Sequence, residues 1–67
     1  QMVKTRDRIG GTLKTAVYEL ENGRFQAFSN YIQDMEEEII GFAESYTAKE
    51  AIRLSRKELR RKWQTER

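Results

Sequence analysis

The sequence predicts an α+β fold in which a three-stranded antiparallel β-meander carries one C-terminal α-helix packed on one face. Two observations support this prediction. The dipeptide Asn22-Gly23, a strong short signal for a β-hairpin, lies between two segments rich in strand-forming residues. Thr47 and Glu50 have the spacing of a capping box and precede a long segment with the apolar periodicity of an amphipathic helix.

The length of 67 residues leaves room for one small α+β domain, which we place at residues 12–67 after a flexible basic N-terminal arm at residues 1–11. The arm is polar and ends in Gly10-Gly11, a pair whose backbone is costly to order. Its basic residues stand at alternating positions. Two interpretations of them stay open: they follow a phosphate backbone, or they are only solvated, as in most charged termini.

The first two strands are expected near residues 12–20 and 24–32, because both segments are rich in β-branched and aromatic residues. Asn22 and Gly23 separate them and accept the positive φ angles of a tight turn. We therefore expect these two strands to pair as an antiparallel hairpin.

The third strand is expected near residues 38–46, although the wider segment 33–46 also fits a helix. As a strand, it places Ile40 and Phe42 on one face and small residues on the other, where the following helix can approach closely. As a helix, it continues an apolar stripe with spacings of three and four residues. Gly41 would weaken that helix by about 1 kcal/mol relative to alanine, so we favour the strand.

The helix is expected at residues 48–65. Its predicted buried stripe recurs every three or four residues and consists of Ala48, Ile52, Ser55, Leu59 and Trp63. Trp63 is expected to cap the core, and stacking on a nucleic-acid base is its alternative role. Leu54 lies outside the stripe and is either an ordinary exposed leucine or part of a second contact surface, such as a dimer seam.

The composition argues against an enzyme and against a metal or cofactor site. The chain contains no cysteine and no histidine, so the common activated nucleophiles and the usual structural zinc site are absent. We interpret the three consecutive glutamates at residues 36–38 as a solvated charge patch rather than as metal ligands. We expect no catalytic residue, no cofactor, no metal and no small-molecule substrate.

The sequence also limits where the chain is expected to act. No apolar run approaches the roughly 20 residues needed to cross a bilayer, and the absence of cysteine fits a reducing compartment. We therefore expect a cytoplasmic protein without membrane contact. A chain of this size buries only roughly 60% of the surface that its unfolded form exposes, so a homodimer or another protein partner is a further expectation.

Charge is distributed unevenly along the chain, although the net charge is only +2. The order is basic, acidic and basic again. Five residues at helical spacing form the predicted contact surface for nucleic acid or an acidic partner: Arg53, Arg56, Lys57, Arg60 and Arg61. The expected function is a small non-enzymatic regulatory or nucleic-acid-associated binding module that uses this basic helix face. The alternative is a protein-interaction or dimerisation module, in which acidic and basic segments pair with each other.

Short fragments of the chain resemble two kinds of domain. Residues 23–28 (GRFQAF), Gly41 and residues 47–51 (TAKEA) are similar to the three-strand-plus-helix pattern of the arm-binding domains of tyrosine recombinases and of the plant Apetala-type DNA-binding domain. They also resemble the hairpin-strand-helix pattern of the HicB antitoxin family. The first resemblance implies DNA binding through the exposed sheet face, although the predicted strands are acidic where such a sheet is expected to be basic. The second implies a toxin-neutralising or dimerising piece.

Overall fold

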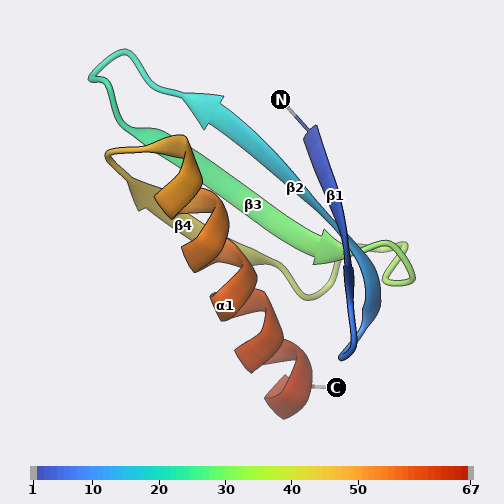
Figure 1. Cartoon of the computed structure of the whole chain (residues 1–67). Coiled ribbons are helices and arrows are strands. Elements are labelled where there is room, and N and C mark those ends of the chain that lie inside the picture. Colours follow the sequence, from blue (N-terminus) through green and yellow to red (C-terminus); the bar gives the residue numbers. More distant parts are fainter. Residues whose placement is uncertain (1, 67) are drawn as a thin grey trace.

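The computed structural model describes residues 2–66, and within them a four-stranded antiparallel sheet is covered on one face by one helix (Figure 1). The elements are β1 (Met2–Asp7), β2 (Gly11–Glu19), β3 (Phe25–Tyr31), β4 (Gly41–Ser45) and α1 (Ala48–Glu66). The strands lie side by side in chain order, so the sheet is a meander. The α+β class, the antiparallel sheet and the C-terminal helix are confirmed. The prediction of three strands is wrong, because the sheet has a fourth.

The additional strand, β1, lies within residues 1–11, which we expected to be a flexible arm. It pairs antiparallel with β2 over its whole length. The turn between them is tight: Gly11 has a φ of +87°, and a Cβ on Gly10 would lie 2.6 Å from the ring of Tyr31. The glycine pair therefore lets the turn pack closely against that ring.

The predicted hairpin is confirmed. Strands β2 and β3 pair with Val17 opposite Ala27, and Gly23 in the turn has a φ of +88°. The side chain of Asn22 accepts a hydrogen bond from the backbone N–H of Arg24. This local bond stabilises the turn that the Asn-Gly dipeptide predicts.

The segment 33–46 forms a loop and a strand rather than a helix. Only residues 41–45 are in β4, so the strand is shorter than predicted. Asp34 orders the preceding loop, because its carboxylate accepts hydrogen bonds from the backbone N–H groups of Glu38 and Ile39. Side-chain bonds of this kind satisfy backbone groups that the sheet leaves unpaired.

The core lies between α1 and one face of the sheet. Its two apolar clusters consist of Leu13, Tyr31, Leu59 and Trp63, and of Val17, Ala27 and Ala51. Trp63 is 7% exposed and its ring centroid lies 4.8 Å from that of Tyr31, in agreement with its predicted place in the core. Close approach of the helix requires Gly41, because a Cβ there would collide with the backbone carbonyl of Ser55. The small residues predicted on this face of β4 are thus confirmed as the helix-packing side.

Candidate nucleic-acid interface

Helix α1 covers one face of the sheet and leaves the other uncovered (Figure 1). Alternate residues of β2 show the division, since Thr15 and Val17 are buried under α1 whereas Tyr18 is exposed on the opposite side. The register places Ala16 of β2 beside Phe28 of β3, and Phe28 beside Phe42 of β4, on this same side. We call this side the open face.

Three aromatic side chains form a row across β2, β3 and β4 on the open face. The ring of Phe28 lies 6.0 Å from that of Tyr18 and 5.0 Å from that of Phe42. The exposed fractions are 54% for Tyr18, 37% for Phe28 and 45% for Phe42. Contiguous exposed apolar side chains mark interaction surfaces, and aromatic rings on a sheet are the surfaces on which unpaired bases stack.

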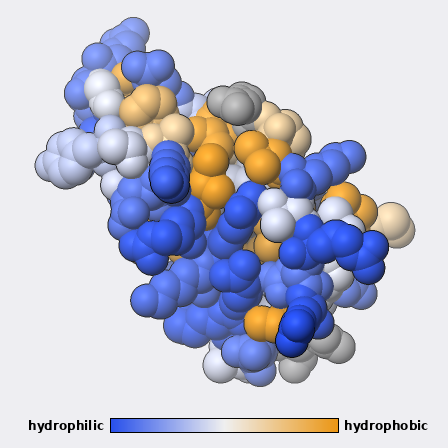
Figure 2. All heavy atoms as spheres, viewed as in Figure 1, coloured by the Kyte–Doolittle hydropathy of each residue, from blue (hydrophilic) through white to orange (hydrophobic). Residues whose placement is uncertain are grey.

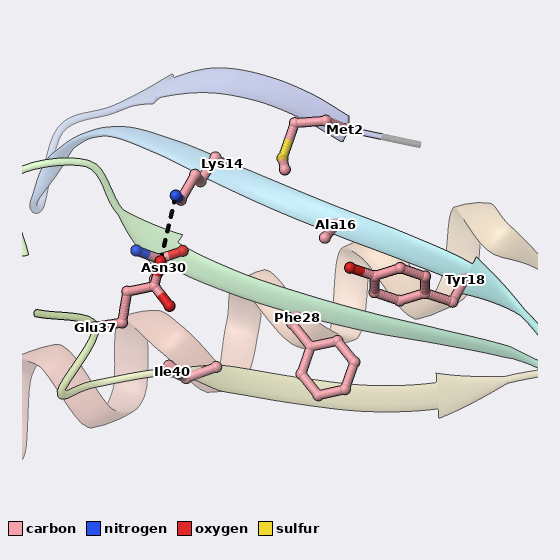
Figure 3. Close-up of a pocket in the computed structure, with 8 residues that line it drawn as sticks. All are labelled: Met2, Lys14, Ala16, Tyr18, Phe28, Asn30, Glu37 and Ile40. Carbon is pink, nitrogen blue, oxygen red and sulfur yellow. Dashed lines mark hydrogen bonds and ion pairs between the residues drawn. The ribbon is translucent and has the colours of Figure 1, made fainter. Parts of the chain in front are cut away.

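The open face is hollowed next to this row (Figure 3). The hollow has a volume of about 310 Å³ and contains Ala16 between two groups of side chains. Tyr18 and Phe28 lie toward one end, and Lys14 and Glu37 lie toward the other (Figure 3). The volume is at the lower end of the range for small-molecule sites, about 300–1,000 Å³. The hollow therefore has room for one small group.

Basic residues border the aromatic row on the side of β1. Lys4 lies directly opposite Lys14 in the sheet, and Arg6 lies opposite Thr12 on the same face. Like charges that face each other across two strands repel, and the carboxylate of Glu37, 3.4 Å from Lys14 Nζ, offsets part of this charge and leaves Lys4 and Arg6 to attract an anion. Strand β1 thus supplies positive charge that the three predicted strands lacked.

The opposite end of the open face is charge-balanced. The carboxylate of Glu44 lies 3.3 Å from the guanidinium of Arg24 and also accepts a hydrogen bond from Gln26. Arg24 stacks over the ring of Tyr46 at 4.7 Å from the ring centroid. The hydrogen bond to Glu44 is the main cause that raises the pKa of Arg24. The net positive charge of the open face is therefore concentrated near β1.

The five predicted helix residues divide into two groups, and the first group holds β1 in place. Arg56 donates a hydrogen bond of 2.7 Å to the hydroxyl of Thr5. Arg60 forms an ion pair of 2.8 Å with Asp7. These two arginines are consequently engaged by the N-terminal strand and have a structural role in the free protein.

The second group, Arg53, Lys57 and Arg61, lies on the exposed side of the helix. Arg53 pairs with Glu50 and Arg61 pairs with Glu58, and both arginine side chains are about 60% exposed. Exposed pairs of this kind are worth about 0–1 kcal/mol, so a stronger ligand can replace them. Within residues 2–66, Lys57 makes no hydrogen bond or ion pair.

A second hollow lies along the flank of α1 that Arg56 and Arg60 occupy. It has a volume of about 510 Å³ and is lined by Ala48, Lys49, Ile52, Arg53, Arg56 and Arg60. Viewed from the side of α1, charged residues cover the helix and apolar residues gather beside its first turns (Figure 2). Arg56 has no carboxylate within 4 Å in the described part of the chain, and burial, with the adjacent Arg60, lowers its pKa. This hollow is apolar in its floor and positive at its rim.

Asp7 and Tyr31 lie on the face of the sheet that α1 covers, and Asp7 connects β1 to the helix. The side chain of Asp7 is 6% exposed and accepts hydrogen bonds from Arg60 and from the hydroxyl of Tyr31 at 2.9 Å. Burial alone would raise the pKa of Asp7, but hydrogen bonds from Ile9, Arg60 and Tyr31 together lower it. Burial and the bond to Asp7 raise the pKa of Tyr31 to about 12. Asp7 is therefore held as a carboxylate.

Comparison of the chain with protein-family models, curated proteins and solved structures finds no match. The resemblances to recombinase arm-binding domains and to HicB antitoxins stay predictions. None of the helices in the described residues is long and apolar enough to span a membrane. The same residues contain no group of three acidic side chains placed to hold a metal ion.

Proposed function

We propose that the chain is a non-enzymatic nucleic-acid-binding module that holds a single strand across the open face. The observation that carries this proposal is the exposed aromatic row of Tyr18, Phe28 and Phe42 beside the basic residues Lys4 and Arg6. Bases stack on the rings, and each stacked base contributes about 1–3 kcal/mol. Phosphates follow the basic side of the face, which makes the affinity depend on salt.

The row favours a single strand over a duplex. In a duplex, the base faces are stacked on each other and only the base edges are reachable from the grooves. Phe28 and Phe42 are set in neighbouring strands on a broad sheet surface, where unstacked bases can lie on them. The recombinase resemblance implies DNA binding through the same sheet face, and a direct comparison of single-stranded and duplex probes shows which form this face binds.

The basic face of α1 is the alternative contact surface for nucleic acid. Its outward residues Arg53, Lys57 and Arg61 are accessible, whereas Arg56 and Arg60 hold β1. The helix face carries no exposed aromatic ring, so it offers phosphate contacts without stacking. We therefore place the bases on the sheet and assign the helix face at most a minor share of the affinity.

Fluorescence anisotropy with labelled single-stranded DNA, single-stranded RNA and a duplex of the same sequence tests the proposal. We expect the single strands to bind at low salt and to weaken steeply toward physiological salt. Phe28→Ala and Phe42→Ala should each lower the affinity about 5- to 150-fold, from about 1–3 kcal/mol per stacked base. Met35→Ala is the matched control, since Met35 is 87% exposed in the loop after β3. If none of the probes binds at low salt, the proposal is refuted.

A protein-interaction module is the second candidate function, and the hollow beside α1 favours it. The apolar floor formed by Ala48 and Ile52 and the unneutralised charge of Arg56 suit an acidic protein segment. This candidate predicts self-association or partner binding that weakens with salt and with Arg53→Glu, but not with Phe28→Ala. Sedimentation of the wild type at high concentration checks self-association, and a monomer that Leu54→Glu leaves unchanged argues against a dimer seam on α1.

A further inference from the structure

We infer that the hollow on the open face receives a guanine base, which Glu37 and Lys14 read along its hydrogen-bonding edge. The inference rests on the proposed function and adds a base preference to it. Three features of the hollow support it: its shape, its pairing of an acceptor with a donor, and the backbone conformation that positions the acceptor.

The shape of the hollow comes from a small residue between larger ones. Ala16 contributes only a methyl group, so the face is recessed between the rings of Tyr18 and Phe28 and the polar end (Figure 3). The side chain of Met2 borders the recess from β1 (Figure 3). A flat ring system placed over Ala16 would contact apolar side chains and direct one edge toward Lys14 and Glu37.

The polar end pairs a charged donor, Lys14, with a charged acceptor, Glu37, beside the amide of Asn30, whose Nδ2 donates a hydrogen bond to the backbone carbonyl of Tyr31. Lys14 Nζ lies 3.4 Å from Glu37 Oε2. An ammonium group can only donate hydrogen bonds, and an ionised carboxylate can only accept them through its two oxygens. The complementary edge must therefore place an acceptor next to donors.

Guanine matches this arrangement better than the other bases. Its edge carries the O6 acceptor next to the N1–H donor and the N2 amino donor. The two oxygens of Glu37 can accept both N–H groups while Lys14 donates to O6, and such charge-assisted bonds are about twice as strong as neutral ones. Adenine, cytosine and uracil each offer a single donor group on the corresponding edge, so one carboxylate oxygen would lose its partner.

The backbone of Glu37 is held in an uncommon conformation. Its φ is +55°, and within residues 2–66 no other residue except glycine has a positive φ. Residues held in this left-handed region are enriched at binding sites, where the surrounding structure fixes them. Here the bonds from Glu38 and Ile39 to Asp34 fix the loop. The ion pair that a base would replace is itself exposed, with side-chain exposures of 34% for Lys14 and 52% for Glu37, and so is weak.

Four fluorescent oligothymidines that differ only in one central nucleotide test the inference: guanosine, inosine, adenosine or cytidine. Inosine keeps O6 and N1–H but lacks the N2 amino group. We expect the guanosine probe to bind about tenfold more tightly than the adenosine and cytidine probes, as hydrogen bonds to a charged group allow. Inosine should fall between them.

Substitutions distinguish recognition of the guanine base from binding of a single strand of any sequence. Glu37→Gln should remove the guanine preference and leave the affinity for plain oligothymidine within about twofold, because the aromatic stacking positions remain. Glu36→Gln and Glu38→Gln are the matched controls, which remove a neighbouring carboxylate and should keep the preference. Circular dichroism confirms that each variant is folded.

Two results overturn the inference while the proposed function stands. The first is equal affinity of the wild type for all four probes. The second is loss of the preference in Glu36→Gln to the same extent as in Glu37→Gln, which would make the effect one of general charge. Failure of every probe to bind at low salt overturns both the inference and the proposed function.

Discussion

Arg60 Nε lies 2.8 Å from Asp7 Oδ2, and this ion pair connects the second half of α1 to the N-terminal strand. Asp7 ends β1, and β1 carries the basic residues Lys4 and Arg6 onto the open face. The sequence predicts Arg60 as part of a contact surface on α1. In the structure, Arg60 instead holds β1, the strand that supplies basic residues to the open face.

Asp7→Asn should destabilise the protein by about 1.5–3 kcal/mol, the usual worth of hydrogen bonds to a charged group. The folded-state pKa of Asp7 lies below its ordinary value of 3.8. Its stabilisation is therefore fully present above that value and is lost as the pH falls through the lower, folded-state pKa. Urea unfolding of the wild type and the variant from neutral to acidic pH checks this. A difference that persists unchanged at the lowest pH would contradict the assignment.

Tyr31 should lose a proton only at strongly alkaline pH. Its pKa is raised from 10.0 to about 12, first by burial and then by the hydrogen bond to Asp7. The folded state therefore holds this proton longer than the unfolded state, so the stabilisation is complete below pH 10 and declines as the pH rises toward about 12. Ultraviolet absorbance titration of the wild type and of Tyr31→Phe isolates this residue, and the ionisation step that the variant lacks should lie near pH 12. Ionisation of Tyr31 at its ordinary value of 10.0 in the folded protein would refute the prediction.

Gly41→Ala should lower the free energy of unfolding by about 1–3 kcal/mol or more, because the added methyl group collides with the backbone of α1 at Ser55 and Leu59. Gly23→Ala is the matched control: it has no atom within 4 Å of the added Cβ but has a φ of +88°. Its cost should come from backbone strain alone. Urea unfolding measures both, and an equal or smaller loss for Gly41→Ala would show that the helix can shift away from β4.

Neutralising basic residues should affect binding differently on the two faces. Lys4→Gln with Arg6→Gln should reduce the salt slope of single-strand binding by about 1.4, since each phosphate contact on a single strand contributes about 0.7. Lys57→Gln with Arg61→Gln changes the charge equally on the exposed side of α1 and should leave the slope nearly unchanged. Anisotropy titrations at several salt concentrations give the slopes, and the reverse ranking would move the phosphate contacts to the helix.

The elements predicted correctly from the sequence are those fixed by short-range signals. Asn22 and Gly23 define their turn locally, and the hydroxyl of Thr47 accepts the backbone N–H of Glu50, as one half of a capping box requires. The other half is not used, because the carboxylate of Glu50 pairs with Arg53 instead. Local signals of this kind are strong enough to position a turn or a helix start.

Strand β1 escaped prediction because its sequence has no apolar face. It is held by pairing with β2 and by long-range bonds from Arg56 and Arg60 to Thr5 and Asp7. Such contacts between distant residues leave no periodic pattern in the strand itself. The helix arginines were correctly placed on α1, but their engagement by β1 could not be predicted without that strand.

The aromatic row on the open face was not predicted, although the sequence contains a signal for it. Gly41 and Ala43 alternate with Phe42, and Ala27 and Ser29 flank Phe28. Small residues on the side of the helix imply that the intervening aromatic rings lie on the opposite, uncovered side. The combination of this alternation in two adjacent strands predicts an exposed aromatic row.

Chemical-shift mapping of the backbone amides during titration with a single-stranded oligonucleotide most directly locates the binding surface. The proposed function predicts the largest perturbations on the open face, at Lys4, Ala16, Phe28 and Phe42, with small changes at residues 53–61. Perturbations concentrated at residues 53–61, with the open face unaffected, would contradict it.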